Sequence, residues 1–125
     1  MNDLEVKATD SSPYMRFENE TGKFEISGTS MPENVFDVYE PVIEWIKGYV
    51  TDPQSATILT INLKYFNSAS AKVLLSVLYA LEPLLIKGKR VEVNWGYLSH
   101  DEESLESGED YASMVNIPFN FIKID

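Results

Sequence analysis

The feature that most constrains the fold is a change of hydrophobic period in the middle of the chain. Over residues 57–65 apolar side chains occupy every second position, which is typical of a β-strand with one buried face. After Asn67 and Ser68 the apolar residues recur every three or four positions, and no charge occurs between Lys72 and Glu82, so a largely buried helix is predicted. A strand that runs directly into such a helix favours an α/β fold, in which helices connect parallel strands.

Similar patterns predict the other elements. Residues up to about Ser12 have no period and are expected to form a loose tail. Pro83 should kink or end the central helix, and Gly88 should close it. The remaining predicted elements, in chain order, are a β-hairpin (14–17 and 23–27), a helix of about five turns that begins at the capping box Ser30-Met31-Pro32-Glu33, a strand (91–97), a helix from Ser99 or Asp101 toward Met114, and a strand (119–124).

This order of elements predicts a single α/β domain over residues 1–125, with a mixed β-sheet and about three helices. A chain of this length forms one domain that buries roughly two-thirds of its unfolded surface. Each strand–helix–strand passage requires a parallel crossover, for which right-handed geometry is strongly favoured.

The first predicted helix carries two apolar stripes. The main stripe, expected to face the core, consists of Phe36, Tyr39, Ile43, Ile46 and Val50. The flanking stripe consists of Val35, Val42, Trp45 and Tyr49. Large aromatic residues are usually buried in a chain's own interior, which favours core for the flanking stripe, but a partner interface remains the alternative.

Composition restricts the kinds of partner and site. The net charge of −10 repels nucleic acid and anionic membranes, so proteins with basic or apolar patches are the expected partners. There is no cysteine and His100 is the single histidine, which excludes disulfides, thiolate zinc sites and multi-histidine metal centres, and no cofactor is predicted. The start of the chain lacks signal-peptide regions, and no long apolar run occurs, so a cytoplasmic protein without a membrane segment is expected.

Common catalytic signatures are absent. A Ser–His–Asp triad would have to use His100 as its base, and Ser68 does not lie in a G-x-S-x-G elbow. Neither a G-x-x-x-x-G-K-[ST] loop nor a G-x-G-x-x-G run is present, which disfavours nucleotide binding through those loops. We therefore predict that the protein is not an enzyme.

Ser68 has two interpretations, as a helix cap and as a phosphorylation site. Asn and Ser are common N-caps, which favours the first. A helix N-terminus has unpaired N–H groups and partial positive charge, so it also accepts an added phosphate. Lys72 follows one turn later, where its ammonium could pair with that phosphate, and Asn67 precedes the site. Ser70 is the only nearby rival.

The acidic run over residues 101–110 has three interpretations. Carboxylates in the first turn of a helix favour its dipole, and a solvated polar face keeps a protein soluble. A dense negative surface is alternatively a recognition patch for a basic partner. A divalent-metal site is disfavoured, because the spacing lacks the EF-hand pattern. The residues concerned are Asp101, Glu102, Glu103, Glu106, Glu109 and Asp110.

Four segments carry a specific family resemblance. The element order, with a strand ending at Ser68, resembles the STAS domains of anti-anti-sigma factors. More closely, SGTSMPENVFDVYEPVIEWIKGYV, LKYFNSASAKVLL, VNWGYLSHDEESLESGEDYASMV and IPFNFI are similar to the SiaC family of bacterial regulatory phosphoproteins. The resemblance spans residues from about 14 to 123, with the PEN, YFN-Ser, NW-aromatic and E-x-GED elements in the same order.

The resemblance implies a switch with several protein partners in c-di-GMP and biofilm signalling. In that family a serine/threonine kinase phosphorylates the residue after Y-F-N, a PP2C-type phosphatase reverses the modification, and the unmodified form binds a diguanylate cyclase and promotes its activity. By motif the modified residue is Ser68. The usual pattern is N-T-S-S-S-K, whereas this chain has Asn67-Ser68-Ala69-Ser70-Ala71-Lys72.

Two alternatives to this function remain at the level of sequence. The first is an anti-anti-sigma-like protein that binds an anti-sigma factor or a switch kinase. The second, from another class, is a metal-dependent enzyme that uses the acidic run.

Overall fold

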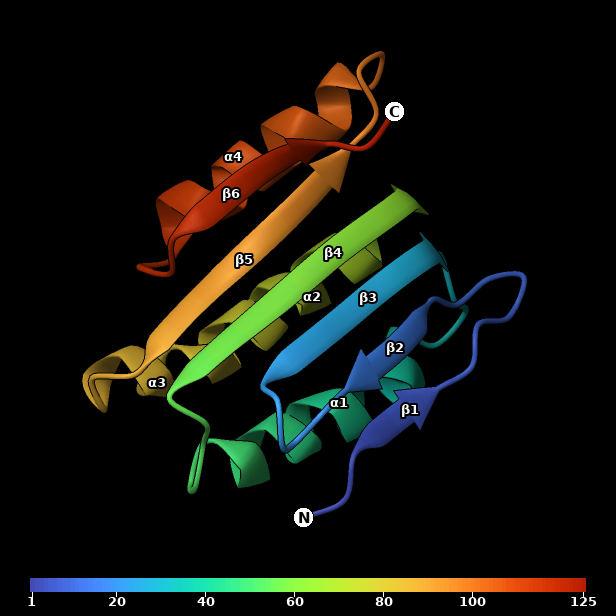
Figure 1. The fold of residues 1–125 in the computed structure, drawn as a ribbon. Helices are drawn as coiled ribbons and strands as arrows, with labels where there is room; N and C mark the ends of the chain where they lie inside the picture. Colours follow the sequence, from blue (N-terminus) through green and yellow to red (C-terminus); the bar gives the residue numbers. More distant parts are fainter.

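The strands form one six-stranded sheet whose spatial order follows the order of the chain, β1 to β6 (Figure 1). The computed structural model describes residues 1–125. Its elements are β1 (Leu4–Val6), β2 (Tyr14–Phe17), β3 (Lys23–Ser30), α1 (Val35–Tyr49), β4 (Ala56–Phe66), α2 (Ser68–Leu81), α3 (Pro83–Ile86), β5 (Arg90–Tyr97), α4 (Glu102–Met114) and β6 (Phe119–Lys123).

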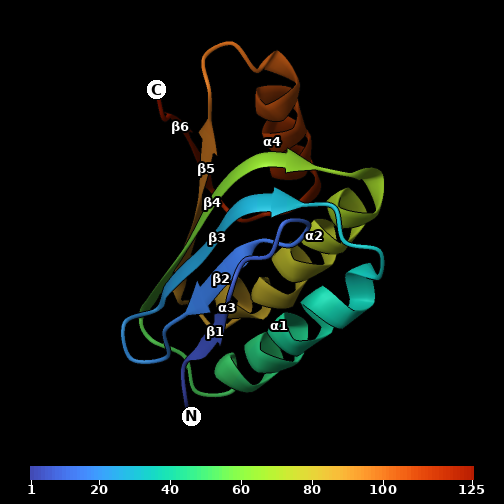
Figure 2. The ribbon, with the colours of Figure 1, turned by 90° about the vertical axis from the view of Figure 1, so that its right-hand side faces the viewer.

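The direction of the strands explains why the helices share one face of the sheet. β1, β2 and β3 are antiparallel neighbours, whereas β3 to β6 are parallel. Successive right-handed crossovers that advance in one direction place every connecting helix on the same side. Figure 2 shows α1, α2 and α4 together on that side, with the other face of the sheet uncovered. The predicted α/β class with a mixed sheet is confirmed.

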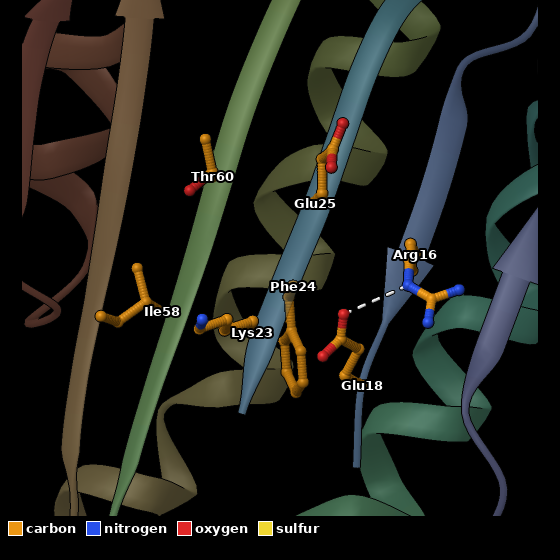
Figure 3. Close-up of a pocket in the computed structure, with 7 residues that line it drawn as sticks. All are labelled: Arg16, Glu18, Lys23, Phe24, Glu25, Ile58 and Thr60. Atoms are coloured by element: carbon orange, nitrogen blue, oxygen red, sulfur yellow. Dashed lines mark hydrogen bonds and ion pairs between the residues drawn. The ribbon is translucent and has the colours of Figure 1, made fainter. Parts of the chain in front are cut away.

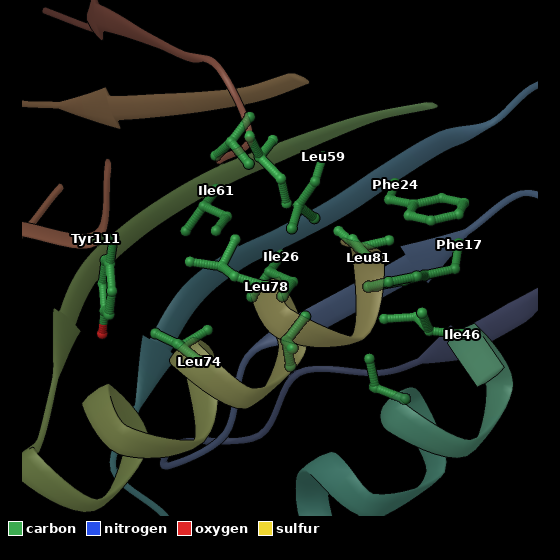
Figure 4. Packing of buried hydrophobic residues seen from close by; sticks show 14 of the residues in the cluster. Phe17, Phe24, Ile26, Ile46, Leu59, Ile61, Leu74, Leu78, Leu81 and Tyr111 are labelled. Carbon is green, nitrogen blue, oxygen red and sulfur yellow. The ribbon is translucent and has the colours of Figure 1, made fainter. Parts of the chain in front are cut away.

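The core lies between the sheet and the helices, as alternation along β4 predicts. Leu59 and Ile61 point toward the helices, and Leu74 and Leu78 of α2 pack against the strands (Figure 4). The combined stretch Ser68–Ile86 is long and apolar enough, by length and composition only, to cross a membrane. In this structure α2 buries its apolar face in the core of the domain, which accounts for its apolar composition.

The expectation of a loose tail is wrong over Leu4–Val6. These residues form β1, which pairs antiparallel with β2. Trp45 Nε1 in α1 also donates a hydrogen bond of 2.8 Å to the Asn2 carbonyl. The polar sequence did not show this edge strand, because only three residues and a long-range contact define it.

The predicted capping box at Ser30 is also wrong. Ser30 is the last residue of β3, where it pairs with Phe66 of β4, and its side chain is buried. Parallel pairing therefore extends the strand through the serine. α1 begins at Val35, and the side chain of Asn34 is its N-cap.

Burial along α1 does not follow the two predicted apolar stripes. The residues of α1 that are buried are Tyr39, Val42, Ile46 and Tyr49, two from each stripe. Phe36, assigned to the core stripe, is 69% exposed. Trp45 is partly buried against Phe17 and Phe24, so most of the flanking stripe belongs to the core.

Candidate functional site

The candidate regulatory residue lies at the carboxyl end of the parallel strands. β4 ends at Phe66 and α2 begins at Ser68, so a single residue separates strand from helix. Ser68 is exposed, and its hydroxyl group has no hydrogen-bond partner within the chain. In open α/β sheets this edge is where ligands and partners usually bind, since the connecting loops and helix N-termini gather there.

Asn67, not Ser68, caps α2. The Asn67 Oδ1 atom accepts a hydrogen bond of 2.9 Å from the backbone N–H of Ser70. The expectation that Ser68 is itself the cap is therefore wrong, because the helix starts one residue earlier than a Ser68 cap requires. Since the amide of Asn67 does the capping, the Ser68 hydroxyl is free at the first position of the helix.

Ser70 occupies a buried hydrogen-bond network below this turn. Its Oγ atom lies 2.7 Å from Ser30 Oγ and donates to the Ser30 carbonyl at 3.0 Å. Ser30 Oγ in turn lies 2.7 Å from the hydroxyl oxygen of Tyr39 in α1. Burial raises the pKa of Tyr39 to about 12, so this phenol stays protonated at neutral pH. Ser70 is fully buried, which denies an enzyme access to its hydroxyl group.

The same network anchors the backbone beside Ser68. The N–H of Asn67 donates to the Ser30 carbonyl at 3.0 Å. One carbonyl at the end of β3 thus accepts from the turn residue and from Ser70 of the following helix. This arrangement ties the start of α2 to β3 and so holds Ser68 at a defined position.

Two shallow grooves flank the first turns of α2. One, of about 340 Å³, lies between α1 and α2 and is lined by Val35, Phe36, Ala69 and Val73 among others. The second, of about 260 Å³, lies between α2 and α4. Lys72 lines both grooves, is exposed and forms no ion pair.

Exposed apolar side chains lie near Ser68 along the chain and in the neighbouring elements. Tyr65, three residues before Ser68, is 56% exposed, and Met31, next to the anchoring Ser30, is 46% exposed. Phe36 of α1 lines the groove that also contains Ala69, the residue after Ser68. Large exposed apolar side chains that gather in one region are typical of a protein interaction site.

The acidic residues lie on the N-cap and the body of α4. Asp101 is the N-cap and accepts a 3.0 Å hydrogen bond from the Ser104 N–H. The other five acidic residues of the run are exposed along the helix. No three His, Asp or Glu side chains in the chain converge as metal ligands. The acidic run therefore provides no ligand cluster for the alternative of a metal-dependent enzyme.

The sequence did not reveal how α4 is seated against the sheet. Gly108 lies against the indole ring of Trp95, where an added Cβ atom would come within 2.6 Å of Trp95 Cδ1. Trp95 Nε1 donates to the Ser104 carbonyl at 2.9 Å, and the Tyr111 hydroxyl donates to the Ala71 carbonyl in α2 at 2.7 Å. A glycine inside a helix, combined with a strand tryptophan, was the available signal for this close contact.

A separate depression lies on the uncovered face of the sheet. Figure 3 shows its lining side chains on β2, β3, β4 and the turn after β2, and its volume is about 390 Å³. Arg16 donates to Glu18 Oε2 at 3.2 Å there, which raises the pKa of the guanidinium. Hydrogen bonds from Thr21 and then from Arg16 lower the pKa of the Glu18 carboxyl. This depression is on the opposite face of the sheet from α2 and does not include the Ser68 turn.

Comparison with known proteins identifies the family. A family model described as "SiaC family regulatory phosphoprotein" matches residues 6–124. An uncharacterised protein of Pseudomonas aeruginosa (strain UCBPP-PA14) is 29% identical over 119 residues, which cover 95% of this chain and 94% of that protein.

Solved structures agree with this match. The crystal structure of apo-SiaC from Pseudomonas aeruginosa has a TM-score of 0.90 at 28% identity, covering 98% of this chain and 99% of that one. A chain in the crystal structure of the diguanylate cyclase SiaD in complex with its activator SiaC, from the same organism, has a TM-score of 0.91 at 28% identity, covering 98% and 100%. The chain described here therefore belongs to the SiaC family of regulatory phosphoproteins.

Proposed function

We propose that this protein is a non-enzymatic cytoplasmic switch that binds a diguanylate cyclase and promotes its activity while Ser68 is unmodified. Phosphorylation of Ser68 by a partner kinase releases the cyclase, and a PP2C-type phosphatase restores binding. The observation that carries the proposal is the free, exposed Ser68 hydroxyl at the start of α2, in a chain of the SiaC family. The related SiaC of Pseudomonas aeruginosa is described as the activator of the cyclase SiaD.

The surroundings of Ser68 favour acceptance of a phosphate by the folded protein. A phosphoserine carries about −1.5 to −2 charges at neutral pH, and the N-terminus of a helix stabilises negative charge. Lys72 follows one turn later, and its ammonium forms no ion pair with a carboxylate. The added group therefore requires no rearrangement of the core.

The same charge opposes docking of a partner over the turn. Met31, Phe36 and Tyr65 are exposed apolar side chains on segments that adjoin the Ser68 turn, and burying a dianion against an apolar surface is strongly unfavourable. Phosphorylation is thus expected to weaken partner binding without unfolding the protein. Ser70 does not serve this role in the proposal, because its hydroxyl is buried in the network with Ser30.

The test uses purified cyclase, kinase and phosphatase from the source cell with matched serine variants. Ser68→Ala should escape phosphorylation and bind the cyclase constitutively, whereas Ser68→Asp should bind it more weakly than the unmodified protein does. Ser76→Ala is the matched control, because Ser76 is also exposed on α2 but lies two turns from its start. Mass spectrometry of the phosphorylated protein and calorimetric titration with the cyclase give the two readouts.

Two results would overturn the proposal. Equal phosphorylation of Ser68→Ala and wild type would show that another residue is the site. Tight binding to an anti-sigma factor, with none to the cyclase, would favour the anti-anti-sigma function instead.

A further inference from the structure

The strand β6 has one edge that pairs with no other part of the chain. It is the last strand of the sheet and its only neighbour is β5. Pro118 O accepts from Val93 N, and Ile124 N donates to Tyr97 O, each at 2.9 Å. Because hydrogen-bonding direction alternates along a strand, the N–H and C=O groups of residues 119, 121 and 123 point away from the sheet.

The two edges of the sheet differ in how they are protected. β1, at the other edge, is only three residues long, and its central Glu5 forms ion pairs with Lys7 and Arg16. β6 has no internal proline and no register shift against β5. Two of its three apolar side chains are exposed, Phe121 at 38% and Ile122 at 42%, whereas Phe119 is half-buried. An open apolar edge of this kind is a template for an additional strand.

An acidic helix lies behind this edge. Figure 1 shows α4 alongside β6 at the margin of the sheet. The side of α4 that faces α2 includes Ser107, Asp110 and Met114. At 100° per residue, Glu102 and Glu109 lie on the opposite side of the helix, which is the side of the free edge. Both are exposed, and neither forms an ion pair.

We propose that β6 accepts an extended basic segment of a partner protein as a seventh strand of the sheet. The free backbone groups of residues 119, 121 and 123 supply the main-chain hydrogen bonds, and Phe121 supplies apolar contact. Lysine or arginine side chains on the helix-facing side of the added strand lie beside Glu102 and Glu109. Their positive charges complement these two carboxylates, which have no ion-pair partner within the chain.

A second copy of this chain fits the same edge less well. Pairing two β6 strands would bring a second acidic α4 beside the first, in a protein whose net charge is already −10. Like charges placed together across an interface cost several kcal/mol, so the charge pattern selects a basic partner. This surface is separate from the Ser68 turn, so the proposal stands independently of the phosphorylation switch.

The first experiment uses the full chain and a synthetic probe. The probe is an acetylated, amidated octapeptide of alternating lysine and valine, and amide hydrogen exchange is followed by NMR. The amides of Phe119, Phe121 and Lys123 should exchange rapidly in the free protein and become protected when the peptide is added. The same peptide with N-methylated valines, which lacks alternate backbone donors, should give much less protection.

The second experiment distinguishes peptide binding at the β6 edge from nonspecific electrostatic attraction of a basic peptide to an acidic protein. The double variant Glu102→Gln/Glu109→Gln should weaken peptide binding about threefold to tenfold, as expected for the loss of two modest ion pairs. Glu103→Gln/Asp110→Asn is the matched control, because Glu103 lines a groove between α4 and the end of β4, and Asp110 lines the groove between α4 and α2. It should weaken binding considerably less.

A third variant tests the backbone directly. Phe121→Pro removes an outward N–H without removing a bond to β5, so it should abolish protection while the thermal unfolding transition persists. The proposal is overturned if the peptide protects none of the three amides, or if both double variants lose affinity equally. It is also overturned if the protein alone self-associates in sedimentation equilibrium and protects the same amides, which would identify a second copy as the occupant.

Discussion

Ser70 Oγ lies 2.7 Å from Ser30 Oγ, although the two residues are 40 positions apart in the chain. This contact joins the first turn of α2 to the last residue of β3, next to the exposed Ser68. The Ser30 carbonyl also accepts from the N–H of Asn67, and the Ser30 hydroxyl contacts Tyr39 of α1. Three elements thus meet at one buried serine beneath the proposed switch.

Loss of the Ser70 hydroxyl should lower the stability of the folded protein. Ser70→Ala removes the bond to the Ser30 carbonyl, but that carbonyl keeps its bond from Asn67, so we expect a loss of about 1 kcal/mol in the free energy of unfolding. Urea denaturation measures this change. Ser76→Ala, an exposed serine on the same helix, should change stability by less than half as much. Equal effects would argue against the buried network.

Removal of the cap should destabilise the turn. Asn67→Ala leaves the N–H of Ser70 without its partner, and the expected loss is about 1 kcal/mol. Asn67→Asp retains an acceptor oxygen at the same place and should keep most of the stability. Thermal unfolding of the two variants tests the assignment, and equal destabilisation by alanine and aspartate would contradict it.

The buried Tyr39 should make the protein sensitive to alkali. Its pKa of about 12 lies above the value of 10.0 for an exposed tyrosine, so the folded state holds the proton more tightly than the unfolded state. The contribution of Tyr39 to the free energy of unfolding is therefore complete below pH 10 and is lost as the pH rises from 10 through 12. The total loss is about 2 to 3 kcal/mol, because each pKa unit corresponds to about 1.4 kcal/mol.

Denaturation at several alkaline pH values measures this dependence. Tyr39→Phe should be less stable than wild type at neutral pH, since Ser30 loses a hydrogen-bond partner. It should also lose stability less steeply above pH 10. Burial raises the pKa of Tyr111 as well, so some alkaline dependence should remain in the variant. An unchanged slope in Tyr39→Phe would refute the assignment.

Two glycines inside helices should respond oppositely to alanine. At Gly108 a Cβ atom would lie 2.6 Å from the Trp95 ring, so Gly108→Ala should destabilise the protein by about 1 to 3 kcal/mol through overpacking. At Gly48 the nearest atom is the flexible end of Met1, so Gly48→Ala should be neutral or stabilise by up to about 1 kcal/mol. Thermal unfolding of both variants gives the comparison, and a stabilised Gly108→Ala would contradict the seating of α4.

Periodicity within one element was sufficient to predict most of the fold. The alternation in β4 and the three-to-four spacing in α2 follow from which face each element buries, and both predictions are confirmed. Asp101 was one of two predicted starts for the last helix, and it is the N-cap. Such signals are local, because caps and periods depend on neighbours in the chain.

The errors arose where a distant segment decides the outcome. β1 exists because it pairs with β2, and Ser30 stays in β3 because β4 lies beside it. Phe36 continues the apolar period of α1 but is exposed, because no other part of the chain covers its side chain. Secondary-structure propensity and hydrophobic periodicity contain no information about which surface of an element is covered by another element.

Hydrophobic period and composition were enough to predict that a strand, a short turn with Ser68 and an apolar helix follow one another, because these elements are specified locally. The cap formed by Asn67, the burial of Ser70 against Ser30 and the free Ser68 hydroxyl could be recognised only from the packed structure. Exposure and hydrogen bonding of a side chain depend on what packs beside it, and here the packing partners come from β3 and α1, more than 25 residues earlier in the chain.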